Sequence, residues 1–156
     1  MRILSLLATA AGLVLGSPAA EAQGPKIVVN AKNGLALEGY DPVSYFTEGA
    51  PVKGVEGFSA KHLGATYYFA TAEHRDRFAN EPAKYAPQFG GYCGYGASRG
   101  YLASVDPEAY TIMNGRLILQ NSKKVLELWR KEPEARLTLA DQNWPSIVER
   151  EGKPIP

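Results

Sequence analysis

The sequence predicts an α+β domain in which β-hairpins are interspersed with short helices. Three pairs of short apolar runs are each joined by a turn signal, and the segments around them carry helix caps and helical spacing. The sequence does not show the regular strand–helix–strand alternation of a doubly wound parallel sheet. We therefore expect antiparallel hairpins, short helices between them, and further helices at the C-terminal end.

The first hairpin signal lies between residues 26 and 40. The apolar runs 27–29 and 35–37 lie on either side of Asn33-Gly34. This dipeptide favours a tight turn with positive φ at both central residues, which suits antiparallel strands.

A short helical turn is expected next. Asp41 is a helix-capping residue type, and Pro42 suits the first helical position. Residues 43–46 should therefore form one turn of helix, followed by a loop over residues 49–57.

A second hairpin and a helix are predicted after this loop. The runs 58–62 and 66–70 are joined by a short segment that contains Gly64. Thr71 is a good N-cap for a helix that ends at Pro82, and a further helical turn should extend to residue 88.

Glycine dominates the segment 89–101. Five of the eleven residues from 90 to 100 are glycine, with tyrosines placed among them. Because glycine favours turns and positive φ angles, this segment is predicted to be a loop.

The C-terminal part begins with the strongest hairpin signal in the chain. The runs 109–113 and 116–120 flank Asn114-Gly115. Two helices should follow: residues 122–131, with Val125, Leu128 and Trp129 on the buried face, and residues 133–149, with a break near Trp144-Pro145.

Charge and the N-terminal pattern limit the class of protein. The 156 residues include 17 basic and 16 acidic side chains, so the formal charge of +1 argues against a nucleic-acid partner. Arg2, the apolar run 3–15 and the small-x-small ending at Ala22 predict a signal peptide, residues 1–22, that is removed on export. We expect a periplasmic or secreted single domain, residues 23–156, without a membrane span.

Residues 38–101 contain a set of motifs: GYDPVSYF (39–46), GATYYFA (64–70), Phe78, Pro82, Tyr85 and GGYCGYG (90–96). Together these motifs resemble the YHS domain as it occurs in small exported bacterial proteins. This resemblance implies a small α+β unit, a β-hairpin followed by a helix, related to metal-binding treble-clef-like domains. It also implies a metal-handling function, for which copper or another transition metal is the expected cofactor.

The cysteine positions of metal-binding relatives are occupied by Ser44, Ala70 and His74 in this chain. Because two of these three residues cannot replace a thiolate ligand, we expect the family's usual site to be lost. The remaining candidates for a metal site are Cys93 and His74, with His62 and Met113 as further possibilities. A Cys93 thiol would suit a soft ion such as Cu(I).

The surroundings of Cys93 also predict a small-ligand site. Tyr92 and Tyr95 flank the cysteine and offer flat faces and hydroxyl groups, and Arg99 could neutralise an anionic ligand. The competing interpretation is that Cys93 fills a crowded corner of the core, that the tyrosines rim it, and that His74 is structural.

Three functional hypotheses follow. The first is an exported YHS-type protein that binds a metal ion or a small molecule between His74 and Cys93. The second is a thiol enzyme with Cys93 as nucleophile and His74 as base. The third is a non-catalytic interaction module. The serines lack a nucleophile-elbow context and no phosphate-binding glycine loop is present, so the sequence favours binding over catalysis.

Overall fold

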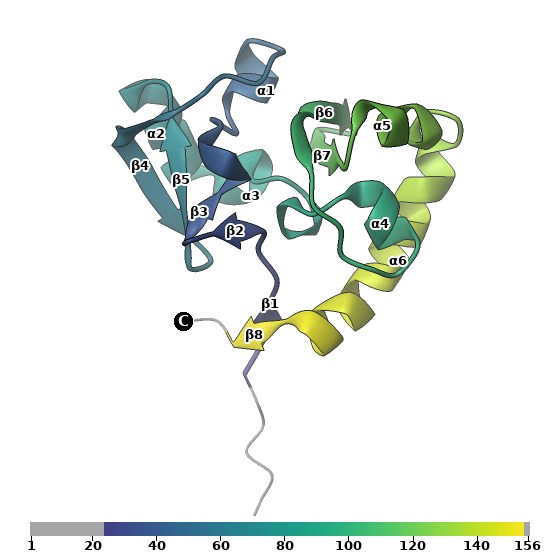
Figure 1. The fold of residues 1–156 in the computed structure, drawn as a ribbon. Helices are drawn as coiled ribbons and strands as arrows, with labels where there is room; N and C mark the ends of the chain where they lie inside the picture. Colours follow the sequence, from purple (N-terminus) through teal and green to yellow (C-terminus); the bar gives the residue numbers. More distant parts are fainter. Residues whose placement is uncertain (1–23, 155–156) are drawn as a thin grey trace, which may run out of the picture.

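The computed structural model describes residues 24–154, and these form the predicted α+β fold with C-terminal helices (Figure 1). The predicted signal peptide lies outside the described residues. The two halves of the chain form two lobes, seen on the left and right of Figure 1. Within residues 24–154, no helix is both long and apolar enough to cross a membrane.

The N-terminal lobe is built on a four-stranded sheet. Its strands are β2 (Ala31–Lys32), β3 (Leu35–Ala36), β4 (Val55–His62) and β5 (Ala65–Phe69). The order is β2-β3-β5-β4, with β3 parallel to β5 and the other pairs antiparallel. Two hairpins joined edge to edge therefore make the sheet.

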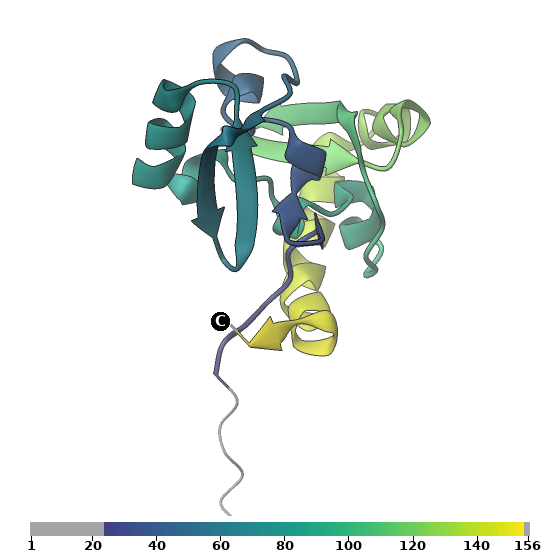
Figure 2. The ribbon, with the colours of Figure 1, turned by 60° about the vertical axis from the view of Figure 1, so that its left-hand side comes forward.

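Helices pack around this sheet (Figure 2). They are η1 (Leu37–Gly39), α1 (Ser44–Thr47), α2 (Ala72–Asn80) and α3 (Pro82–Tyr85). The predicted capping is confirmed, because the Thr71 side chain accepts a hydrogen bond from the backbone N–H of His74.

The C-terminal lobe pairs one hairpin with helices. Its elements are η2 (Phe89–Gly91), α4 (Gly94–Ser98), β6 (Asp106–Met113), β7 (Arg116–Gln120), α5 (Lys123–Trp129) and α6 (Pro133–Glu151). Helix α4 packs against α6, and α5 packs against the hairpin.

All three predicted hairpins are present, and their turns have positive φ at both central residues. The φ angles are 53° and 80° at Asn33-Gly34, 48° and 77° at Leu63-Gly64, and 53° and 72° at Asn114-Gly115. The prediction for the first strand of the first hairpin is wrong, because β3 pairs with β2 and not with residues 27–29. Instead β1 (Lys26–Ile27) pairs with β8 (Lys153–Pro154), near the other end of the chain.

Three helical details also differ from the predictions. Residues 94–98, expected as loop, are helical, and Gly94 and Gly96 of α4 lie so close to their neighbours that an added Cβ would be crowded. Helix α6 continues through Pro145 without the expected break. In α5 the buried side chains are Leu126 and Trp129, whereas Leu128 is exposed.

A buried cluster joins the two lobes. Tyr45 of α1 packs with Leu117 and Leu119 of β7, and all three are at most 1% exposed. The Tyr45 hydroxyl donates a hydrogen bond of 2.8 Å to the carbonyl oxygen of Pro107. Because this cluster contains residues of both lobes, it fixes their relative position.

Tyr67 makes the stability of this fold sensitive to alkaline pH. The side chain is 3% exposed, and burial raises its pKa to about 12, whereas the unfolded phenol titrates near pH 10. Above pH 10 the unfolded chain loses this proton first, so the free energy of unfolding falls until the folded group also titrates. Between pH 9 and 11 Tyr67 should account for a loss of about 1 kcal/mol, which Tyr67→Phe should remove.

Urea unfolding of wild type and Tyr67→Phe at pH 9 and at pH 11 measures this difference. Tyr101→Phe is the control, because the Tyr101 side chain is 47% exposed. An equal loss of stability in wild type and Tyr67→Phe would contradict the assignment.

Candidate functional site

Cys93 lies at the N-terminus of α4 and is 1% exposed. Its thiol donates to Oε1 of Gln120, with Sγ and Oε1 3.3 Å apart, and the sulfur accepts from the backbone N–H of Gly96 at 3.5 Å. The thiol proton is therefore used in an internal hydrogen bond, and the sulfur is shielded from solvent.

The space beside Cys93 is tightly packed. A Cβ on Gly94 would lie 2.5 Å from Cγ2 of Ile118 and 3.3 Å from atoms of Gln120 and Trp129. Gln120 Oε1 also accepts from the backbone N–H of residue 95, which fixes the orientation of its amide group. This corner of the core has the packing expected where a cysteine serves as a small buried side chain.

His74 lies in α2 and is bound to a buried carboxylate. Its Nδ1 is 2.6 Å from Oδ2 of Asp41, whose side chain is completely buried. Asp41 also accepts backbone N–H hydrogen bonds from Val43, Ser44 and Ala70, at 2.8, 3.3 and 2.9 Å. One carboxylate thus connects the start of α1, the end of β5 and helix α2.

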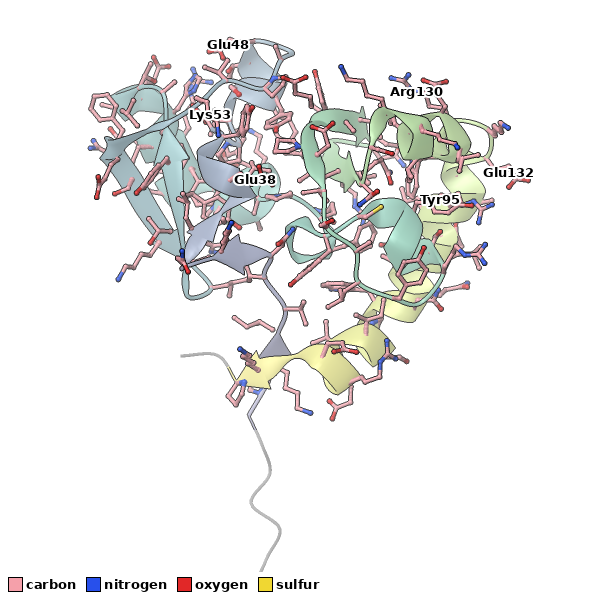
Figure 3. All side chains as sticks on the ribbon, viewed as in Figure 1. Glu38, Glu48, Lys53, Tyr95, Arg130 and Glu132 are labelled. Atoms are coloured by element: carbon pink, nitrogen blue, oxygen red, sulfur yellow. The ribbon has the colours of Figure 1, made fainter. Side chains whose placement is uncertain are left out.

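The other ring nitrogen of His74 faces the end of α1. Nε2 is 3.3 Å from Oγ1 of Thr47 and 3.5 Å from Oε1 of Glu48. The Glu48 side chain is 45% exposed, whereas that of His74 is 9% exposed. This nitrogen therefore lies just below the molecular surface, and Figure 3 shows Glu48 at the outer end of α1.

The structure does not bring Cys93 and His74 together. Helix α2 belongs to the N-terminal lobe and α4 to the C-terminal lobe, and both views show them well apart (Figures 1 and 2). The hydrogen-bond partners of the two side chains are different residues. The residues that surround Cys93 thus do not fit a shared copper site with His74, and within residues 24–154 no three His, Cys, Asp or Glu side chains form a metal-binding group.

The predicted ligand-binding residues lie in or beside α4. Tyr95 packs beside the core of the C-terminal lobe, with the Arg136 guanidinium 4.8 Å from its ring centroid (Figure 3). Arg99 is exposed at the end of α4, and Tyr92 is half-buried. Three cavities lie on the described part of the chain, and none of them is lined by Tyr92, Tyr95 or Arg99.

The largest of these cavities, about 750 Å³, lies between the lobes, and we call it the interlobe groove. The other two, of about 350 and 180 Å³, lie along the N-terminal segment. The interlobe groove is lined by residues of the β2–β3 hairpin and its N-terminal flank, of η1 and β5, and of the segments before β4 and before β6. These residues are Asn30, Lys32, Asn33, Leu35, Leu37, Glu38, Lys53, Tyr68, Ser104 and Val105.

The charged groups of the interlobe groove are Lys32, Lys53 and Glu38, so its lining carries a formal charge of +1. The Lys53 ammonium is held in place, because it donates to the backbone oxygen of Glu38 at 2.8 Å and lies 4.1 Å from the centroid of the Tyr40 ring. Figure 3 shows Lys53 and Glu38 close together on the N-terminal lobe. Within the described residues Lys32 has no carboxylate within ion-pair distance.

Sequence reasoning did not find the Asp41–His74 pair or the interlobe groove. Asp41 was interpreted only as a helix cap, although a capping carboxylate has a second oxygen that can bind a distant histidine. The groove residues come from separate segments of the chain, so no local motif marks them.

No protein-family model, curated protein or solved structure matches this chain.

Proposed function

We propose that this chain is an exported binding protein of the YHS type that takes a small organic anion into the interlobe groove. The observation that carries the proposal is the groove itself. Its volume of about 750 Å³ falls in the range of small-molecule sites, which are lined by apolar side chains and a few polar groups.

The lining of the groove suits an anion with an apolar body. Leu35, Leu37 and Val105 supply apolar surface, and Tyr68 adds an aromatic ring. The ammonium groups of Lys32 and Lys53 attract negative charge, and the internal contacts of Lys53 reduce the entropy that is lost when it orders around a ligand.

Two parts of the proposal rest on the sequence. Export follows from the N-terminal pattern of residues 1–22, which lie outside the described residues. The YHS assignment rests on the motifs of residues 38–101, and the hairpin followed by a helix, β4–β5 and α2, supports it.

The thiol-enzyme alternative has less support from the geometry. A catalytic cysteine needs access to its substrate and a nearby base, whereas Cys93 is 1% exposed and its sulfur contacts Gln120 and Gly96. Copper binding at Cys93 stays a prediction from the resemblance.

Benzoate is a suitable probe for the groove, because it combines a carboxylate with an aromatic ring. We expect it to shift the backbone amide NMR signals of the groove residues, and benzylammonium, of similar shape and opposite charge, to shift them less. Lys32→Gln or Lys53→Gln should weaken benzoate binding about threefold, the loss expected for one exposed ion pair.

Lys124→Gln is the matched control, because Lys124 is exposed on α5, away from the groove residues. Its affinity for benzoate should equal that of wild type. Benzoate shifts confined to other parts of the molecule, or equal binding of both probes, would overturn the proposal.

A further inference from the structure

The interlobe groove contains a carboxylate as well as its two ammonium groups. Glu38 of η1 lines the groove and is exposed. Within residues 24–154 its carboxylate takes part in no ion pair. The Lys53 ammonium binds the backbone oxygen of Glu38 at 2.8 Å and not the carboxylate of the same residue, although Figure 3 shows the two side chains close together. The carboxylate is therefore available to a ligand.

The backbone that carries Glu38 is strained. Leu37, Glu38 and Gly39 have φ angles of 53°, 52° and 79°, so three successive residues have positive φ. This conformation is unfavourable for residues other than glycine, and it persists where the surrounding structure holds it, often at binding sites. Here Leu37 is buried in the cluster that joins the lobes, and the backbone N–H of Gly54 donates to the Gly39 oxygen at 2.8 Å. Packing thus fixes the position of Glu38 at the groove.

A cation without a partner lies on the adjoining hairpin. Lys32 is exposed on β2, and its partner strand β3 leads directly into η1. Within the described residues Lys32 forms no ion pair with Glu38 or with any other carboxylate. The groove therefore offers one unpaired charge of each sign beside an apolar lining. A ligand with a single charge can pair with only one of them.

We infer that the ligand of the interlobe groove is a zwitterion, an amino carboxylate with an apolar body, and that Glu38 binds its ammonium group. This inference rests on the proposed function and specifies the class of ligand. Lys32 and Lys53 attract the carboxylate of the ligand, and Glu38 attracts the ammonium group. Glu38 determines specificity, because its charge favours an amino carboxylate and repels a plain carboxylate.

A matched pair of probes tests the role of Glu38. 4-(Aminomethyl)benzoate and 4-ethylbenzoate share a carboxylate, a ring and a similar shape, but only the first carries an ammonium group. We expect both to shift the backbone amide NMR signals of the groove residues in wild type. In Glu38→Gln the affinity for 4-(aminomethyl)benzoate, relative to that for 4-ethylbenzoate, should fall about threefold, the loss expected for one exposed ion pair.

Glu56→Gln is the matched control, because Glu56 is exposed on β4 and does not line the groove. The ratio of the two affinities should equal that of wild type in this variant. Lys32→Gln should weaken the binding of both probes by a similar factor, because both carry the carboxylate.

The outcomes separate this inference from the proposed function. Binding of 4-ethylbenzoate in the groove without binding of 4-(aminomethyl)benzoate would overturn the inference and leave the proposed function standing. An unchanged ratio of affinities in Glu38→Gln would have the same meaning. If neither probe shifts the signals of the groove residues, the inference and the proposed function both fail.

Discussion

Replacing Asp41 by alanine is expected to lower the free energy of unfolding by about 3 to 5 kcal/mol, because its buried carboxylate is the acceptor for several donors in the core. The substitution leaves the backbone N–H groups of Val43 and Ala70 and the Nδ1–H of His74 without their acceptor in the core. Each buried donor left without a partner costs about 1 to 3 kcal/mol. Because these donors lie in three different elements, the loss should loosen α1 and α2 together.

Urea denaturation followed by circular dichroism measures this change. Asp76→Ala is the control, because Asp76 lies on the same helix as His74 and its side chain is 64% exposed and paired with Arg75. That variant should lose less than about 1 kcal/mol, as surface ion pairs do. Similar losses of stability in the two variants would contradict the prediction that the hydrogen bonds of Asp41 stabilise α1 and α2.

The parts of the fold that the sequence predicted depend on local interactions. Asn33-Gly34 and Asn114-Gly115 adopt the positive φ angles that their residue types favour, so each hairpin turn could be placed from two residues. Thr71, the predicted N-cap, caps its helix by a hydrogen bond within one helical turn. Interactions of this range are visible in a short window of sequence.

The parts that it did not predict depend on distant contacts. Residues 26–27 pair with residues 153–154, a contact between opposite ends of the chain. The glycines of α4 predict a loop, but Gly94 is required where the helix packs on Ile118. Pro145 was expected to break α6, but the helix is continuous and Trp144 packs against the core of the C-terminal lobe.

The same distinction applies to the candidate sites. His74 could be selected from the sequence because few residue types bind metals, but its partners Asp41 and Glu48 are 33 and 26 positions away. Cys93 was selected for its rarity, which gives no information about access to solvent. A cavity between two lobes is formed only when the lobes pack, so the interlobe groove has no local signature.

Adding a single methyl group to the glycine-rich segment, at Gly90, should strongly destabilise the fold. Gly90 has φ of 59°, and a Cβ on it would lie 1.9 Å from the carbonyl oxygen of Val28. Because the obstacle is backbone rather than a flexible side chain, the N-terminal segment has to move. Gly90→Ala should therefore lower the free energy of unfolding by about 2 to 4 kcal/mol, from overpacking added to the cost of the left-handed conformation.

Gly34→Ala separates these two causes. Gly34 has φ of 80° and no atom within 4 Å of an added Cβ, so only the conformational cost of about 1 kcal/mol applies. In Gly90→Ala the backbone N–H of Asn30, which donates to the Gly90 oxygen at 2.7 Å, should also exchange its hydrogen faster. Equal destabilisation in the two variants, with unchanged exchange at Asn30, would mean that residues 28–30 do not pack on Gly90 in solution. If the predicted difference is found, Gly90 holds the N-terminal segment against the C-terminal lobe, and Asn30, which lines the interlobe groove, is positioned by this contact.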